Sequence, residues 1–161
     1  MFGSVRFSND GGIIEISHPI NTINMNRIHL VISVESTPCS SLDGMFGLGT
    51  EHMVIPEAVQ WEPIDVRPHP VLTISDKIEE KVRMWTTTLK FFTCHDLGDT
   101  STRYVYRLKF AGGNYALIGS SSRPFPVLTV QRTAPEKPSD NQWNEASISW
   151  TTAFPPQTFF V

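Results

Sequence analysis

Few residues of this chain are of the types found in catalytic centres, and their spacing matches none of the known arrangements. Cys94, His95 and Asp96 are consecutive and contain the three side-chain types of a cysteine-nucleophile triad. Neighbouring residues of a strand point to opposite faces, however, and such triads assemble from residues that are distant in sequence. We therefore interpret this tripeptide as the end of a strand that runs into a turn at Gly98.

No metal or cofactor site is predicted. The five histidines never fall at ligand spacing, and the chain has neither an HExxH nor a CxxC motif. The glycine-rich segment 44–49 lacks the Gly-Lys-Ser/Thr ending of a phosphate-binding loop. The sequence thus favours a protein that is not an enzyme and has no cofactor, and it identifies no small-molecule ligand. A hydrolase whose carboxylates come from distant strands is the least favoured alternative.

Length and composition predict one β-rich domain over residues 1–161. A chain of 161 residues can bury a core without a metal or a disulfide. Its only cysteines are Cys39 and Cys94, which we expect to be free thiols in a reducing, intracellular compartment. No signal-peptide pattern and no run of about 18 apolar residues is present. We therefore expect a soluble protein of the cytoplasm or a virion, neither secreted nor membrane-spanning.

Alternation of apolar and polar residues is the main structural signal, and it is clearest over Arg103–Phe110. The face that we predict to be core carries Tyr104, Tyr106, Leu108 and Phe110. The opposite face, predicted to be solvated, carries Arg103, Arg107 and Lys109. Further strands are expected at Phe2–Phe7, Gly12–Ser17, Arg27–Glu35, Val71–Ser75, Thr86–Cys94, Tyr115–Gly119, Pro126–Arg132 and Ala146–Thr152. Eight or nine short strands with polar turns predict a mostly β fold, either a β-sandwich or a jelly-roll-like barrel.

One short helix is predicted near residues 76–86. Asp76 and Glu79 have the spacing of a capping box. The apolar residues that follow at helical spacing are Ile78, Val82 and Trp85. A long strand that runs into 86–94 is the alternative.

Three irregular segments are expected: a long Ser/Gly/Pro-rich loop at 37–50, a polar loop at 135–141 and an apolar C-terminal tail at 154–161. The tail ends in Phe159, Phe160 and Val161. It is either a last edge strand on its own core or a segment that docks on a neighbouring subunit, since extended peptides add readily to sheet edges.

The arrangement of charge departs most clearly from an ordinary surface. Segment 35–65 has six acidic residues and no Lys or Arg, whereas segment 101–135 has five bases and no acid. The bases are Arg103, Arg107, Lys109, Arg123 and Arg132. If the two segments are neighbours in the fold, they offset each other. If they form separate patches, the chain is suited to head-to-tail association with its own copies.

The leading hypothesis is a non-enzymatic, self-associating structural or interaction protein. The five bases would form an interaction patch, and Phe159, Phe160 and Val161 would form an oligomer tail. The short Thr/Ser/Pro-rich β chain resembles small viral structural proteins of the coat or matrix kind.

The alternative is a nucleic-acid-binding β-sandwich that uses the basic 103–132 segment. There, SSSRPFPVLTVQR is similar to an arginine-bearing loop that enters a strand in immunoglobulin-like DNA-binding sandwiches. Against it, the pI near 5.9 is acidic for a dedicated nucleic-acid binder.

Overall fold

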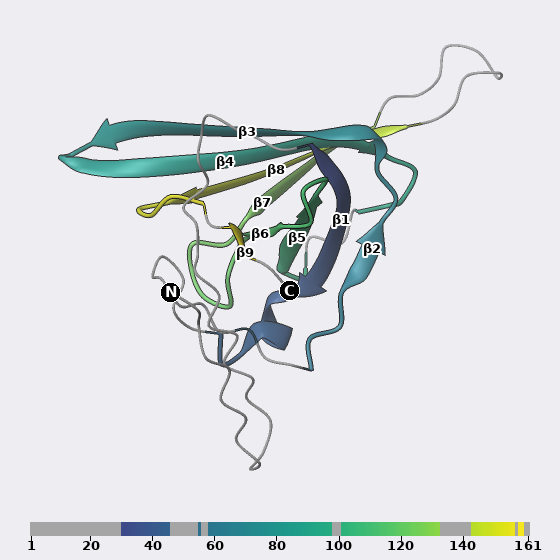
Figure 1. Ribbon diagram of the computed structural model, residues 1–161, viewed down its shortest axis with the longest axis horizontal. Helices are drawn as coiled ribbons and strands as arrows, with labels where there is room; N and C mark the ends of the chain where they lie inside the picture. Colours follow the sequence, from purple (N-terminus) through teal and green to yellow (C-terminus); the bar gives the residue numbers. More distant parts are fainter. Residues whose placement is uncertain are drawn as a thin grey trace.

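The computed structural model describes residues 30–45, 55, 58–97, 101–132, 143–156 and 158–159. Nine strands in these residues form two antiparallel sheets that pack face to face (Figure 1). The chain is therefore mostly β, as its alternation predicts, and of the two architectures expected it adopts the β-sandwich.

Each sheet combines strands that are distant in sequence. The five-stranded sheet has the order β2 (Glu62–Ile64), β1 (Val31–Pro38), β5 (Tyr104–Phe110), β6 (Tyr115–Ile118) and β9 (Thr158–Phe159). The four-stranded sheet has the order β3 (Arg67–Glu79), β4 (Val82–Thr93), β8 (Asn144–Thr152) and β7 (Val127–Arg132). A short 3-10 helix, η1 (Cys39–Leu42), follows β1.

The main core lies between the sheets because alternate residues of each strand point inward. The five-stranded sheet contributes Val31, Val34, Ile64, Tyr106, Leu108, Phe110, Ala116 and Ile118. The four-stranded sheet contributes Leu72, Leu89, Phe91, Ala146, Ile148 and Trp150. The core face predicted for β5 is confirmed, with Tyr104 only partly buried at its start.

The other face of β5 is less solvated than its sequence predicts. A second buried cluster lies there and consists of Cys39, Leu42, Val105 and Leu117. Partly buried Trp61 and Tyr115 pack against this cluster. The segment that follows β1 thus supplies side chains that cover the outer face of the five-stranded sheet.

The helix predicted near 76–86 is wrong, because this segment forms a hairpin of β3 and β4. The strands meet at Glu80 and Lys81, whose φ angles are +48° and +71°. Positive φ at both central residues is the mark of the type I′ turn, whose twist suits a two-residue hairpin. The usual residues in that turn are Asn and Gly, so Glu-Lys gave no turn signal in the sequence. Of the two predicted structures, the long strand running into 86–94 is closer to the observed hairpin than the helix is.

Two of the segments expected to be irregular have regular structure in their described parts. Thr37 and Pro38 belong to β1 and Cys39–Leu42 to η1, so the expected 37–50 loop starts later. Thr158–Phe159 of the tail pairs with β6 of its own chain, as the edge-strand alternative requires. The 135–141 loop, Phe160, Val161 and the strands expected at Phe2–Phe7 and Gly12–Ser17 lie outside the described residues.

Candidate functional site

One end of the sandwich carries a polar row on its inner face. Glu62, Ser36 and Tyr106 lie directly opposite one another on β2, β1 and β5. Directly opposite residues of neighbouring strands share a face, so all three are on the side that faces the other sheet. The next row inward is entirely apolar and buried, and it consists of Ile64, Val34, Leu108 and Ala116. On β6 the first row continues with Ile118, which is buried in the main core, so the polar positions of this row are confined to β2, β1 and β5.

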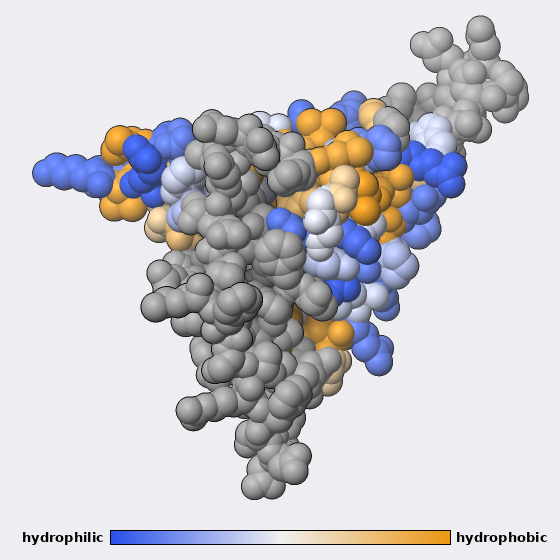
Figure 2. All heavy atoms as spheres, in the orientation of Figure 1, coloured by the Kyte–Doolittle hydropathy of each residue, from blue (hydrophilic) through white to orange (hydrophobic). Residues whose placement is uncertain are grey.

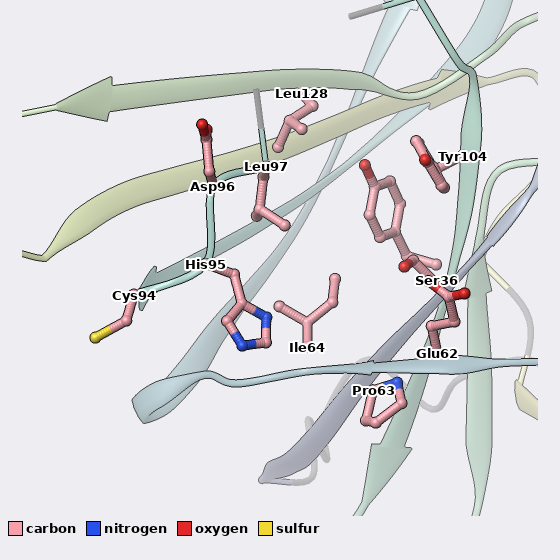
Figure 3. Close-up of a pocket in the computed structure, with 11 residues that line it drawn as sticks. Ser36, Glu62, Pro63, Ile64, Cys94, His95, Asp96, Leu97, Tyr104 and Leu128 are labelled. Atoms are coloured by element: carbon pink, nitrogen blue, oxygen red, sulfur yellow. The ribbon is translucent and has the colours of Figure 1, made fainter. Parts of the chain in front are cut away.

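A cleft of about 530 Å³ opens beside this row (Figure 3). Its apolar side is formed by Ile64, Leu97 and Leu128, which come from three separate elements. Its polar lining includes Ser36, Glu62, His95, Asp96, Tyr104 and Tyr106. The volume falls within the ~300–1,000 Å³ of small-molecule sites, which are also concave and mixed in polarity.

Tyr106 is the most enclosed polar residue of the cleft, with 4% of its surface exposed. Burial raises the pKa of its hydroxyl to about 12, and the nearby Cys39 and Tyr104 act in the same direction. The hydroxyl therefore keeps its proton at neutral pH and can both donate and accept a hydrogen bond.

The lining carries negative charge. Asp96 accepts a hydrogen bond from Arg132 at 2.6 Å, so its charge is partly offset. Glu62 makes no ion pair within the described part of the chain. Among the described lining residues there is no Lys or Arg. The cleft therefore favours a cationic or hydrogen-bond-donating group over an anion.

The consecutive Cys94, His95 and Asp96 border this cleft. The sulfur of Cys94 points away from the His95 ring (Figure 3). Asp96 accepts a hydrogen bond from Arg132. This geometry agrees with the reading of the tripeptide as a strand end, because a nucleophile and its base must be within hydrogen-bond reach.

The structure brings the acidic and basic segments together at one point. β1 pairs with β5 so that Glu35 lies opposite Arg107, and Arg107 Nε donates to Glu35 Oε2 at 2.6 Å. The guanidinium also lies 4.6 Å from the Trp61 ring centre and 5.1 Å from that of Tyr115. For this pair, the alternative in which neighbouring segments offset each other is the one observed.

The five predicted patch residues do not share one strand: Arg107 and Lys109 are in β5, Arg132 is in β7, and Arg103 and Arg123 lie outside the strands. Lys109 lies 5.7 Å from the Tyr115 ring centre, on the same strand as Arg107. Arg103 and Arg123 are exposed. Arg132 ends β7 in the four-stranded sheet, where it is paired with Asp96. Arg107 and Lys109 are therefore neighbours, whereas Arg132 is paired with Asp96, which lines the cleft.

Sequence reasoning gave no indication of the β3–β4 arm, which we define as residues 76–84. The pairing of β4 with β8 ends at Trp85, so the arm extends beyond the rest of its sheet (Figure 1). Figure 2 shows hydrophobic residues among hydrophilic ones on this projection. Ile78 is 68% exposed and Val82 is 50% exposed.

Other site types find no support in the part of the chain that the structure describes. Those residues include no group of three or more His, Cys, Asp or Glu side chains that could hold a metal ion. No helix among them has the length and hydrophobicity needed to cross a bilayer. Cys39 is a buried free thiol and Cys94 an exposed one.

Together these features define an antiparallel β-sandwich with an open polar end and a projecting two-stranded arm. Comparison of the chain with protein-family models, with curated proteins and with solved structures found no match.

Proposed function

We propose that the protein is a non-enzymatic, self-associating interaction protein whose copies pair through the edge of β3 that no other described strand covers. The observation that carries this proposal is the arm, a two-stranded ribbon with exposed apolar side chains. An isolated two-stranded hairpin is marginally stable in water, and an uncovered strand edge is a template for another chain.

The edge of β3 has the features of a pairing surface. Among the described strands, β3 is the first of its sheet and forms a ladder only with β4. Every residue from Ser75 to Glu79 is exposed. The outward face of the sheet, from β3 across β4 to β8, carries hydroxyls, which belong to Thr73, Ser75, Thr86, Thr88, Ser149 and Thr151. No run of like charge therefore repels a second copy from this face.

Charge on the arm suits pairing of identical copies. Segment 76–83 has three acids and three bases, so its net charge is zero. Two such arms can approach without net repulsion, and a twofold arrangement applies the same surface to itself. Two β3 strands paired in this way would join the two four-stranded sheets into one.

The alternative as a nucleic-acid-binding β-sandwich has less support. Two of the five bases, Arg107 and Arg132, are already in ion pairs with Glu35 and Asp96. Phosphate contacts need exposed bases whose charge is not offset locally. The self-association hypothesis still includes a coat- or matrix-like role, because the short Thr/Ser/Pro-rich β chain resembles small viral structural proteins.

The test measures mass in solution by size-exclusion chromatography with light scattering. In a two-residue hairpin the flanking pair Glu79–Val82 exchanges hydrogen bonds, so the N–H of Ile78 points to this edge of β3. Ile78→Pro removes this N–H without breaking the hairpin ladder. Ile78→Thr is the matched control, because it removes the same apolar side chain and keeps the N–H.

We expect a wild-type dimer, a monomeric Ile78→Pro variant and a weakened dimer for Ile78→Thr. Raising the salt concentration should weaken the dimer only moderately, because backbone pairing and apolar contact do not depend on screening. A wild-type protein that stays monomeric at high micromolar concentration would contradict the proposal, and so would an Ile78→Pro variant of unchanged mass.

Deletion of residues 157–161 separates this proposal from the oligomer-tail hypothesis. Thr158–Phe159 pairs with β6 of its own chain, so we expect the deletion to leave the dimer intact. A shift to monomer on deletion would instead favour docking of the tail on a neighbouring subunit.

A further inference from the structure

We propose that the cleft at the open end of the sandwich binds a small organic amine that carries an apolar body. This site is independent of self-association through β3. Its lining comes mainly from β1, β2, β5, β7 and the segment after β4.

The polar row is unusual for the inner face of a sandwich. A sandwich normally fills its inner face with apolar side chains, as the adjoining row of Ile64, Val34 and Leu108 does here. Glu62, Ser36 and Tyr106 take the same inward positions one step along the strands. Tyr106 is buried, so its hydroxyl has a cost in desolvation unless it meets a partner, whereas Glu62 is exposed on β2 and accessible to a ligand.

The charge of the cleft lining determines whether it favours a cationic or an anionic ligand. The described lining has the carboxylates of Glu62 and Asp96, but no Lys or Arg. Arg132 offsets Asp96, so Glu62 supplies the negative charge that is left. An ammonium group can donate to the Glu62 carboxylate and to the hydroxyl oxygens of Ser36 and Tyr106. A carboxylate or phosphate in the same place would meet like charge.

The opposite wall of the cleft is apolar and can contact the apolar body of the ligand. Ile64, Leu97 and Leu128 converge on the cleft from β2, from the segment after β4 and from β7 (Figure 3). Removing an apolar ring from water against these side chains contributes affinity that the charged group does not. The cleft thus pairs one cation-binding side with one hydrophobic side.

The test uses three probes of similar size with the same phenyl ring: phenethylamine, 2-phenylethanol and 3-phenylpropionate. Binding is followed by amide chemical shifts of the full-length protein, which report both affinity and location. For a ligand this small we expect a dissociation constant in the roughly millimolar range. The amine should bind about tenfold more tightly than the alcohol, because the alcohol lacks the charge-assisted hydrogen bonds. The carboxylate should bind most weakly.

Two variants and two matched controls locate the site. Glu62→Gln and Tyr106→Phe should each weaken phenethylamine binding about tenfold. Glu79→Gln removes one carboxylate from the distant arm, and Tyr115→Phe removes one hydroxyl from the outer face of the same sheet. Both controls should bind like the wild type. Glu62 is exposed on β2, so Glu62→Gln keeps the test valid if Tyr106→Phe fails to fold.

Shifts around Glu62, Ser36 and Tyr106 that saturate with the amine and shrink in both variants would support the proposal. It is overturned if phenethylamine gives no saturable shifts at about ten times the expected dissociation constant. It is also overturned if the carboxylate probe binds as tightly as the amine, or if both variants bind the amine like the wild type.

Discussion

Arg107 and Glu35 form an ion pair across the β1–β5 ladder, with Arg107 Nε and Nη2 each 2.6 Å from Glu35 Oε2. The Arg107 side chain is only 19% exposed, and the Trp61 ring covers the guanidinium. The sequence predicted a solvated arginine on an interaction patch. The fold instead uses it to join the acidic and basic segments within one sheet.

Arg107→Gln should therefore destabilise the protein by about 1–3 kcal/mol, since it leaves Glu35 partly buried without its cation. This replaces the small effect that a solvated Arg107 would give. Lys77→Gln is the matched control, because the Lys77–Glu79 pair has the same 2.6 Å separation with side chains 62% and 54% exposed. Exposed pairs contribute about 0–1 kcal/mol. Urea unfolding of both variants provides the measurement, and equal losses would argue against a structural role for Arg107.

The turn at Glu80 and Lys81 gives a second prediction. Both residues have left-handed φ values, which Asn and Gly adopt more readily than Glu and Lys. The double variant Glu80→Asn/Lys81→Gly should raise stability by about 1 kcal/mol. Thermal unfolding measures the change, with Lys77→Gly inside β3 as a destabilising control. A loss of stability in the double variant would instead suit the helix that the sequence predicted, because Gly is unfavourable there.

The buried hydroxyl of Tyr106 makes the stability of the folded protein depend on pH in the alkaline range. Desolvation raises its pKa from 10.0 to about 12 in the folded chain. Between these values the unfolded chain loses the proton while the folded chain keeps it, so stability falls as pH rises. The contribution is fully present below about pH 10 and is lost through about pH 12.

Comparison of wild type with Tyr106→Phe isolates this effect, because the other titrating groups are common to both. Urea unfolding at about pH 9 and about pH 11.5 should show a fall that is larger in the wild type by about 2 kcal/mol. Identical pH dependence in the two proteins would show that the Tyr106 hydroxyl titrates normally. Absorbance titration of the three tyrosines gives an independent check.

The strands were predictable because their signal is local. In β5 the alternation of Tyr106, Leu108 and Phe110 with polar residues reports directly which face is buried. A period of two needs no knowledge of the partner strand, only that one face meets a core. The same reasoning did not foresee the second cluster around Val105, because its cover comes from η1 and Trp61, which are distant in sequence.

The helix prediction shows where a local signal misleads. Ile78, Val82 and Trp85 have helical spacing, yet Ile78 lies opposite Arg83 and Trp85 lies opposite Asp76 in a hairpin. Short apolar patterns are ambiguous between the two structures, and the turn residues that would have decided between them are missing. Pairing of β4 with β8 along nine residue pairs favours the strand, and this contact is not visible in the local sequence.

The β class and the core face of β5 could be predicted from the chain alone, since both follow from the periodicity of single strands. Which charges meet and where polar side chains gather depended on how the strands assemble. Glu35 meets Arg107 because β1 pairs with β5, and the Glu62–Ser36–Tyr106 row exists because β2 adds to β1. Strand order and register depend on contacts between residues far apart in the chain. The candidate cleft therefore had no signature in any one segment.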